Sequence, residues 1–155
     1  MKRFENRIQY RFYNTYYLEK ALTHRSVKNH YEGNYERLEF LGDAIIDHVV
    51  SLWLFKKYVQ CDEGTLTKKR AELVNREFLA MLGKNLQVTE VIKFDSGVNI
   101  NDEKVANNIA ADVYEAIVGA IYLDGGYEDA TAFITRTLCL SEHMSREYKT
   151  HTTTE

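Results

Sequence analysis

Residues 36–55 read ERLEFLGDAIIDHVVSLWLF, and this stretch decides the fold class. Apolar side chains recur in it at steps of three and four residues, the spacing that lines one face of an α-helix. The stripe consists of Leu38, Leu41, Ile45, Val49 and Leu52, and it continues toward Phe55. We expect Asn34 to cap this helix and the sequence CDEG at residues 61–64 to stop it.

Helical periodicity also extends to both sides of this stretch. Residues 17–22 predict a short first helix, which is followed by a polar connection that reaches Gly33. Thr65 and Asn75 are each expected to cap one helix of a hairpin, and the second of these helices is expected to end at Gly83. The chain contains no proline, so nothing forces a break in any of these helices.

The C-terminal half predicts a second long helix. A polar surface loop is expected over residues 94–103, and the helix over residues 104–123, with DGG at residues 124–126 ending it. A last amphipathic helix carries apolar residues between positions 130 and 138. No alternating strand pattern competes with these helices, so we expect an all-α fold.

Composition limits the class of protein. A chain of 155 residues with 45% hydrophobic and 28% charged residues predicts one globular domain, here residues 1–144, followed by a polar tail at residues 145–155. The formal net charge of −3 excludes a polycation that binds nucleic acid by charge alone. The apolar runs are short, and Cys61 and Cys139 suit neither a disulfide framework nor a zinc site. We therefore expect a reduced, cytoplasmic location and no membrane partner.

Carboxylates gather on the two long helices. Glu36, Glu39 and Asp43 have i, i+3, i+7 spacing, which places them in one row beside the apolar stripe. Asp112 and Glu115 have i, i+3 spacing on the later helix. Some of these acids also have a structural interpretation, since the helix dipole alone favours Glu36 in a first turn and Glu39 can be a solvated surface residue.

Two features favour function over structure at these acids. Gly42 and Asp43 place two poor helix formers inside a strong helix, at a cost of roughly 1–1.5 kcal/mol relative to alanines. Asp112 lies in an apolar helix, where a carboxylate is expensive unless it is protonated, hydrogen-bonded or bound to a cation. Oxygen ligands without nearby His or Cys at ligand spacing favour Mg²⁺ or Mn²⁺ over Zn²⁺.

The acidic segments resemble a known family. Residues 36–44 (ERLEFLGDA) are similar to the signature of the ribonuclease III nuclease domain, and residues 111–116 (ADVYEA) and 119–126 (GAIYLDGG) resemble its second acidic helix. The resemblance covers about residues 10–138. It also includes ALTHRS at residues 21–26, DEG at 62–64 and AELVN at 71–75.

The resemblance implies an all-α homodimeric endonuclease for double-stranded RNA that acts in RNA processing, including that of ribosomal RNA. It implies a divalent metal ion, 5′-phosphate and 3′-hydroxyl ends, and a staggered cut. The positions that match the metal-binding carboxylates of the family are Glu39, Asp43, Asp112 and Glu115. Asp43 and Glu115 match its catalytic residues, and Glu115 is the one tied most directly to catalysis.

The same resemblance assigns further residues around the substrate and between subunits. Glu36 and Glu63 match acidic positions that the family uses near the substrate. Phe40 matches an aromatic residue that the family packs into its partner subunit, although a core phenylalanine is the alternative at this position. The cations that are candidates for contact with RNA phosphates are Arg25, Lys28, Lys68, Lys69, Arg70 and Arg76.

The sequence also departs from the family pattern. Tyr35 lies where the family often has Asn before its first Glu, and residues 107–111 (NNIAA) are a looser version of the segment before the second Asp. Nothing after Leu138 has the length or strand pattern of the double-stranded-RNA-binding domain that is common in the family. None of these departures removes a predicted metal ligand.

Two other functions are compatible with parts of the sequence. A catalytically silent RNA- or ribosome-binding module of the same fold would have lost carboxylates, and none is lost here. An all-α metal-dependent nucleotide phosphohydrolase also uses acidic pairs on helices. None of the three functions requires a small organic cofactor, and we expect none.

Overall fold

The computed structural model describes residues 1–28 and 33–140. Within these residues the chain forms helices joined by loops, and its β-structure is limited to one isolated bridge between Thr23 and Lys93. The helices are α1 (Lys2–Ile8), α2 (Thr15–Ala21), α3 (Glu36–Lys57), α4 (Glu63–Leu73), α5 (Arg76–Asn85), the 3₁₀ turn η1 (Val88–Glu90), α6 (Glu103–Gly125) and α7 (Tyr127–Thr137). The predicted all-α class is confirmed.

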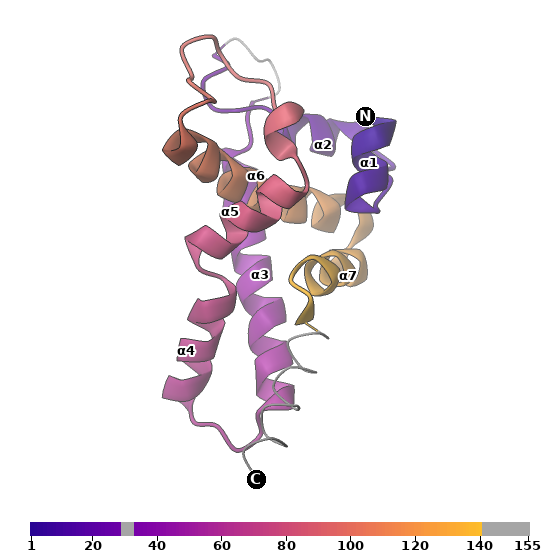
Figure 1. The fold of residues 1–155 in the computed structure, drawn as a ribbon. Coiled ribbons are helices and arrows are strands. Elements are labelled where there is room, and N and C mark those ends of the chain that lie inside the picture. Colours follow the sequence, from indigo (N-terminus) through magenta and orange to yellow (C-terminus); the bar gives the residue numbers. More distant parts are fainter. Residues whose placement is uncertain (29–32, 141–155) are drawn as a thin grey trace.

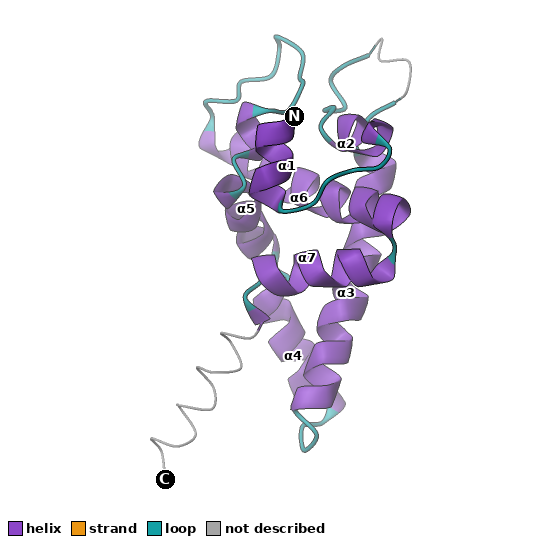
Figure 2. Cartoon of the chain, turned by 90° about the vertical axis from the view of Figure 1, so that its right-hand side faces the viewer, coloured by secondary structure: helices purple, strands orange, loops and turns teal. Residues whose placement is uncertain are grey.

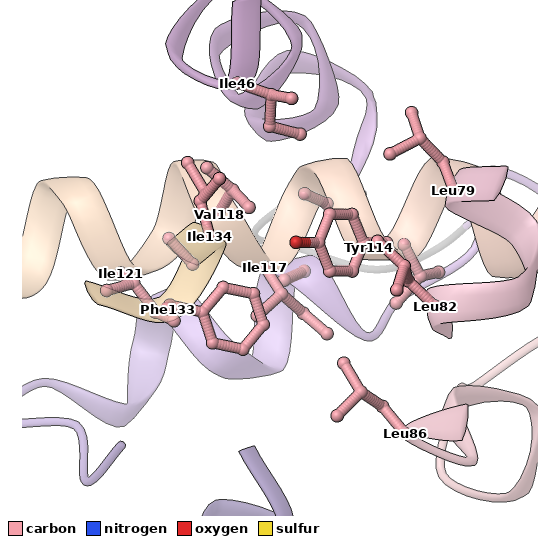
Figure 3. Packing of buried hydrophobic residues seen from close by; sticks show 14 of the residues in the cluster. Ile46, Leu79, Leu82, Leu86, Tyr114, Ile117, Val118, Ile121, Phe133 and Ile134 are labelled. Carbon is pink, nitrogen blue, oxygen red and sulfur yellow. The ribbon is translucent and has the colours of Figure 1, made fainter. Parts of the chain in front are cut away.

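Helix α6 is the centre of the fold. Every residue from 109 to 121 is buried, because α3, α5, α2 and α7 all pack against this helix (Figures 1 and 2). Figure 3 shows side chains from α3, α5 and α7 converging on α6, where the Tyr114 ring stacks on Phe133 with 5.6 Å between ring centroids. A helix that is apolar on all faces is stable only in such a central position.

Glycines allow α3 and α6 to cross at very short distance. A methyl group at Gly42 of α3 would overlap the backbone carbonyl of Glu115, and one at Gly119 of α6 would overlap the carbonyl of Leu38. The helix backbones therefore touch at this crossing, with no side chain between them. This packing explains why Gly42, a poor helix former, lies in the middle of a strong helix.

The apolar stripe of α3 is buried only in part. Leu38 and Val49 are 4% exposed, whereas Leu52 is 38% and Phe55 is 68% exposed, so the expected continuation of the core stripe to Phe55 is wrong. The C-terminal half of α3 leaves α6 and runs beside α4 in a hairpin that extends away from the rest of the fold (Figure 1). A two-helix hairpin covers only one face of each helix.

The predicted caps of α3 and α4 need correction. Tyr35, not Asn34, is the N-cap of α3, although the Asn34 carboxamide accepts a hydrogen bond from the Glu36 N–H at 2.9 Å. Asp62, not Thr65, caps α4, because its carboxylate accepts the Thr65 N–H at 2.9 Å. The predicted cap of α5 at Asn75 is confirmed, since its side chain accepts the N–H of Phe78.

Helix α5 continues past its predicted end. It runs through Gly83 to Asn85, because Gly83 packs directly under the backbone carbonyl of Ala110 in α6 and not in a turn. Met81 of this helix is 45% exposed, whereas Leu79 and Leu82 are buried. A glycine that permits close helix packing and one that ends a helix look the same in a sequence.

The N-terminal segment forms helix α1, which the sequence pattern did not indicate. Phe4 and Ile8 are buried, but a helix of seven residues is too short to be recognised by its period. The segment after α1 is held by Asp124 at the end of α6, whose carboxylate accepts hydrogen bonds from the Tyr10 hydroxyl at 2.6 Å and the Asn14 N–H at 2.8 Å. These bonds tie the start of the domain to its central helix.

The predicted loop and helices of residues 94–138 are confirmed in their order and type. The polar loop precedes α6, the DGG sequence ends α6 at Gly125, and α7 follows as the last amphipathic helix. The tail predicted at residues 145–155 lies outside the described residues. None of the helices in the described ranges has the length and apolar character needed to cross a membrane.

Candidate metal centre

The crossing of α3 and α6 brings the two acidic rows together. Glu39 lies within hydrogen-bonding reach of Asp112, and Asp43 within hydrogen-bonding reach of Glu115. Gly42 lies between the two acids of α3 and touches the Glu115 backbone. The short distance between the helix axes therefore sets the distance between the carboxylate pairs.

The carboxylate oxygens are close enough to share one cation. One oxygen each from Glu39, Asp112 and Glu115 lie within 4.8 Å of one another. Asp112 and Glu115 are 5% exposed, whereas Asp43 lies on the exposed side of the cluster. The cluster opens into a pocket of about 450 Å³ that is lined by Glu36, Glu39, Phe40, Asp43, Arg76 and Glu115.

Crowding of the carboxylates raises their affinity for protons. Burial, the hydrogen bond and charge of Asp43 and the charge of Glu39 raise the pKa of Glu115 to about 9. Burial, the charge of Asp112 and their mutual hydrogen bond raise the pKa of Glu39 to about 7. Burial and the neighbouring carboxylates therefore favour the protonated forms of Glu39 and Glu115 unless a cation binds beside them.

The donor set fits a divalent metal ion. The oxygens come from carboxylates on two rigid helices, the ligand type that Mg²⁺ and Mn²⁺ prefer. The three clustered oxygens lie at a mutual distance that one ion can bridge, and the exposed position of Asp43 leaves one side of the cluster open to water or substrate. The cluster can therefore bind a divalent cation and present it to an approaching phosphate.

Arg76 lies at the edge of this cluster. Its guanidinium donates to Asp112 Oδ1 at 2.5 Å and to the Asn108 carbonyl at 3.2 Å, and lies 3.9 Å from Glu115 Oε1. Burial lowers the pKa of Arg76, but the hydrogen bond and charge of Asp112 raise it more, so the net direction is upward. The side chain is 51% exposed, so this predicted RNA contact lies between the acids and the solvent.

Tyr35 also contacts the cluster, and sequence reasoning assigned it no role. The Tyr35 hydroxyl donates to Asp112 Oδ2 at 3.1 Å, in a fully buried position. Burial and the charge of Asp112 raise the pKa of Tyr35 above its usual value. The available signal was the departure from the family pattern at this position, where a ring with a polar tip directly precedes the acidic row.

The two acids that were expected near the substrate, Glu36 and Glu63, lie in different parts of the structure. Glu36 is exposed and lines the same pocket as Glu39 and Asp43. Glu63 begins α4 and instead lines a hollow of about 540 Å³ between α3 and α4, together with Phe55 and other residues of that hairpin. Within one chain, Glu63 is therefore not part of the acidic cluster.

The predicted RNA-binding cations lie in three regions: the turn after α2, helix α4, and the start of α5, where Arg76 lies. Arg25 and Lys28 are exposed in the turn after α2, and Lys68 is exposed on α4. Lys69 lies over the Tyr58 ring at 4.3 Å from its centroid, and Arg70 donates to the Ser51 hydroxyl at 2.9 Å. The last two side chains therefore also hold α4 against α3.

Comparison with known proteins identifies the family. A family model described as Ribonuclease-III-like matches residues 14–141. Ribonuclease 3 of Bdellovibrio bacteriovorus is 39% identical over 160 residues, which cover 96% of this chain and 68% of that protein. Ribonuclease 3 of Campylobacter curvus is 38% identical over 147 residues, which cover 91% of this chain and 65% of that protein. The chain belongs to the ribonuclease III family.

The predicted resemblance and enzyme class are thus confirmed, and the chain is a ribonuclease III-type endoribonuclease by family. Ribonuclease 3 of Brucella canis is 41% identical over 132 residues, which make up 85% of this chain and 54% of that protein. The chain spans between about half and two thirds of the length of these relatives.

Solved structures show the same fold. The structure of the nuclease domain of ribonuclease III from Campylobacter jejuni has a TM-score of 0.82 and 39% identity, and the match covers 88% of this chain and 94% of that one. That domain has structural flexibility in a region involved in dimer formation. Dicer from Pichia stipitis, at 23% identity and a TM-score of 0.62, shares the fold over 84% of this chain and 56% of its own.

The raised pKa of Glu115 predicts how stability depends on pH in the presence of EDTA. The folded state keeps this proton up to a pKa of about 9, whereas the unfolded chain loses it near 4.5, so stability falls as the pH rises between these values. We expect the Tm to drop by more than about 3 °C over this interval, which corresponds to roughly 1 kcal/mol for a domain of this size.

The measurement is thermal unfolding followed by circular dichroism across this pH range. The Glu115→Gln variant controls for all other titrating groups, and its Tm should depend less on pH than that of the parent. Addition of Mg²⁺ should raise the Tm most at high pH, where protons no longer compete for the carboxylates. A parent Tm that rises with pH relative to the variant would contradict the prediction.

Proposed function

We propose that this ribonuclease III domain hydrolyses phosphodiester bonds of double-stranded RNA with Mg²⁺ as its cofactor and Mn²⁺ as a substitute. The observation that carries the proposal is the convergence of four carboxylates from two helices: Glu39, Asp43 and Glu115 line one open pocket, and Asp112 contacts Glu39. Cleavage would leave 5′-phosphate and 3′-hydroxyl ends. A role in RNA processing, including that of ribosomal RNA, and a cytoplasmic location are parts of this proposal.

The residues of the pocket have different roles in this proposal. Asp112 and Glu115 would hold the cation from the buried side and Glu39 would complete the set, while Asp43 faces the solvent, from which the RNA backbone would approach. A bound divalent cation would supply an activated water and stabilise the charge on the leaving 3′-oxygen. Glu36 lies on the exposed rim and is positioned to orient water or substrate.

Cations at the surface supply affinity for the RNA backbone. Arg25, Lys28 and Lys68 are exposed, and Arg76 stands at the mouth of the acidic pocket. An A-form duplex is recognised mainly through its phosphates and 2′-hydroxyls, so exposed cations without stacking aromatics suit this substrate. Glu63 remains a residue near the substrate only in an assembly that brings α4 to the RNA.

The assembly that we propose is a two-fold homodimer through the exposed face of α3. Phe40 is 81% exposed, which excludes the core position considered as its alternative. A hollow of about 290 Å³ lies between α3, α6 and α7, and it is lined by Leu41, Ala44, Ile45, His48, Tyr122 and Tyr127. An exposed ring and an apolar hollow on one face can pair reciprocally with the same features of a second copy.

Phe40→Ala is expected to convert the dimer into monomers at micromolar concentration. Loss of an aromatic ring buried between subunits costs about 3–5 kcal/mol, which weakens association by more than about 100-fold. Sedimentation velocity of the parent and the variant measures this change. Tyr13→Ala, which removes a ring that is 89% exposed in the segment before α2, serves as the control and should leave the dimer intact. A parent that sediments as a monomer yet makes paired cuts would refute the arrangement.

The direct test of the function compares three substrates with and without Mg²⁺. The parent protein is incubated with labelled duplex RNA, with the corresponding single strands, and with nucleoside triphosphates. We expect metal-dependent cleavage of the duplex alone, with 5′-phosphate ends. Release of phosphate or pyrophosphate from nucleotides would support the phosphohydrolase alternative, and duplex binding without cleavage would support the silent module.

A further inference from the structure

Asp112 has both carboxylate oxygens engaged by donors of different kinds. Tyr35 donates to Oδ2 at 3.1 Å from a fully buried position, and Arg76 donates to Oδ1 at 2.5 Å from the half-exposed side. Oδ1 is therefore the oxygen on the side of Arg76, which lines the pocket of the acidic cluster. Oδ2 is the oxygen that the protein interior holds.

Tyr35 is itself fixed at its backbone and at its ring. Its N–H donates to the Thr23 carbonyl at 3.0 Å, and its own carbonyl accepts the Glu39 N–H at 2.8 Å. The edge of the ring meets His24, with 5.5 Å between ring centroids. A tyrosine held in this way has little freedom to move its hydroxyl away from Asp112.

We propose that Tyr35 is a positioning residue for the metal centre, which fixes the carboxylate of Asp112 so that Oδ1 points at the cation. This inference rests on the proposed function of the acidic cluster. Through its backbone carbonyl Tyr35 also supports the first turn of α3, where Glu39 lies. One buried residue thus links a ligand on α6 to a ligand on α3.

A hydrogen bond from Tyr35 can improve metal binding because a free carboxylate rotates. An aspartate on a helix can turn about its last side-chain bond and present either oxygen or neither to an ion. A hydrogen bond to one oxygen removes that freedom before the ion arrives, and loss of such an outer partner lowers metal affinity by about 10–100-fold in metalloproteins. Arg76 does not serve this purpose, because it donates to the oxygen that the ion would use.

The test measures the binding of Mn²⁺ to the Tyr35→Phe variant in the absence of RNA. The concentration of free Mn²⁺ is monitored by its electron paramagnetic resonance signal. The variant keeps the ring against His24 and removes only the hydroxyl. We expect the Kd for Mn²⁺ to rise by about 10–100-fold. Tyr114→Phe is the matched control, because it removes an equally buried hydroxyl whose hydrogen-bond partner, at 2.5 Å, is Thr137 Oγ1 of α7 and not a carboxylate.

A purely structural role predicts a different result. Both variants lose one buried hydrogen bond and should lose similar thermal stability, but only Tyr35→Phe should lose Mn²⁺ affinity. In an Asp112→Asn background, Tyr35→Phe should have no further effect on Mn²⁺ binding, because the residue acts through Asp112. A Kd within about two-fold of the parent, or an equal loss in Tyr114→Phe, would overturn the proposal.

The same experiment separates this inference from the function on which it rests. If the parent binds Mn²⁺ and Tyr35→Phe binds it more weakly while duplex RNA stays intact, the positioning role is supported and the nuclease function is refuted. If the parent cleaves duplex RNA with Mn²⁺ and Tyr35→Phe binds the ion as tightly as the parent, the function is supported and the positioning role is refuted.

Discussion

Glu115→Gln is expected to abolish cleavage of duplex RNA while the protein stays folded. The amide keeps the shape of the side chain but removes an anionic ligand from the most buried part of the cluster. Loss of several kcal/mol of charge stabilisation in the transition state corresponds to a rate loss on the order of 10³-fold or more. No other single change in the pocket is expected to affect activity more.

The fold of this variant should not suffer. Glu115 carries a raised pKa because burial and the neighbouring Asp43 and Glu39 disfavour its charge. Near neutral pH the parent must take up a proton at Glu115 when it folds, whereas glutamine is neutral in both states, so the Tm of the variant in EDTA should equal or exceed that of the parent. Glu103→Gln, an exposed substitution in the first turn of the same helix, should keep full activity. Turnover by Glu115→Gln at saturating Mg²⁺ would refute the assigned role.

Gly42→Ala is expected to destabilise the domain by about 3 kcal/mol or more. The added methyl group would overlap the backbone carbonyl of Glu115, and a backbone can yield only by moving one helix. Helix propensity alone predicts the opposite sign, a gain of about 1 kcal/mol for alanine over glycine inside a helix. The sign of the measured change therefore separates helix packing from local preference.

Urea unfolding of the parent and of Gly42→Ala measures this effect, with Gly97→Ala as the matched control. A methyl group at Gly97, in the loop before α6, would meet no atom within 4 Å, so that variant should be neutral or slightly more stable. We also expect Gly42→Ala to weaken Mn²⁺ binding, because moving α3 from α6 separates Glu39 from Asp112. Equal unfolding midpoints for the two variants would contradict the packing argument.

The main helices and the identity of the acidic residues could be predicted from the sequence. Helical period depends on neighbours three and four residues apart, so α3 and α6 are visible in the apolar spacing of the chain alone. The same period places Glu39 beside Asp43, and Asp112 beside Glu115, on one face of their helices. The family resemblance then joined the two faces into one predicted site.

Capping residues, by contrast, were predicted with mixed success. Asn75 caps α5 as expected, whereas α4 is capped by Asp62 rather than by Thr65. Asp, Asn, Ser and Thr all accept hydrogen bonds from the first turn of a helix, so several candidates within a few residues compete. Which residue forms the cap depends on where the preceding chain enters the helix, and this is a property of the folded protein.

Only the tertiary structure decided what the remaining residues do. Gly42 suggested function by its poor helix propensity, and it proves to be a contact between two backbones. Phe55 continues an apolar stripe and is nevertheless exposed, because α3 extends beyond α6. Tyr35 and Arg76 lie 77 and 36 residues away from Asp112 in the chain, and both donate to its carboxylate. Period and residue type act over a few neighbouring residues, whereas burial and pairing depend on which distant segments cross.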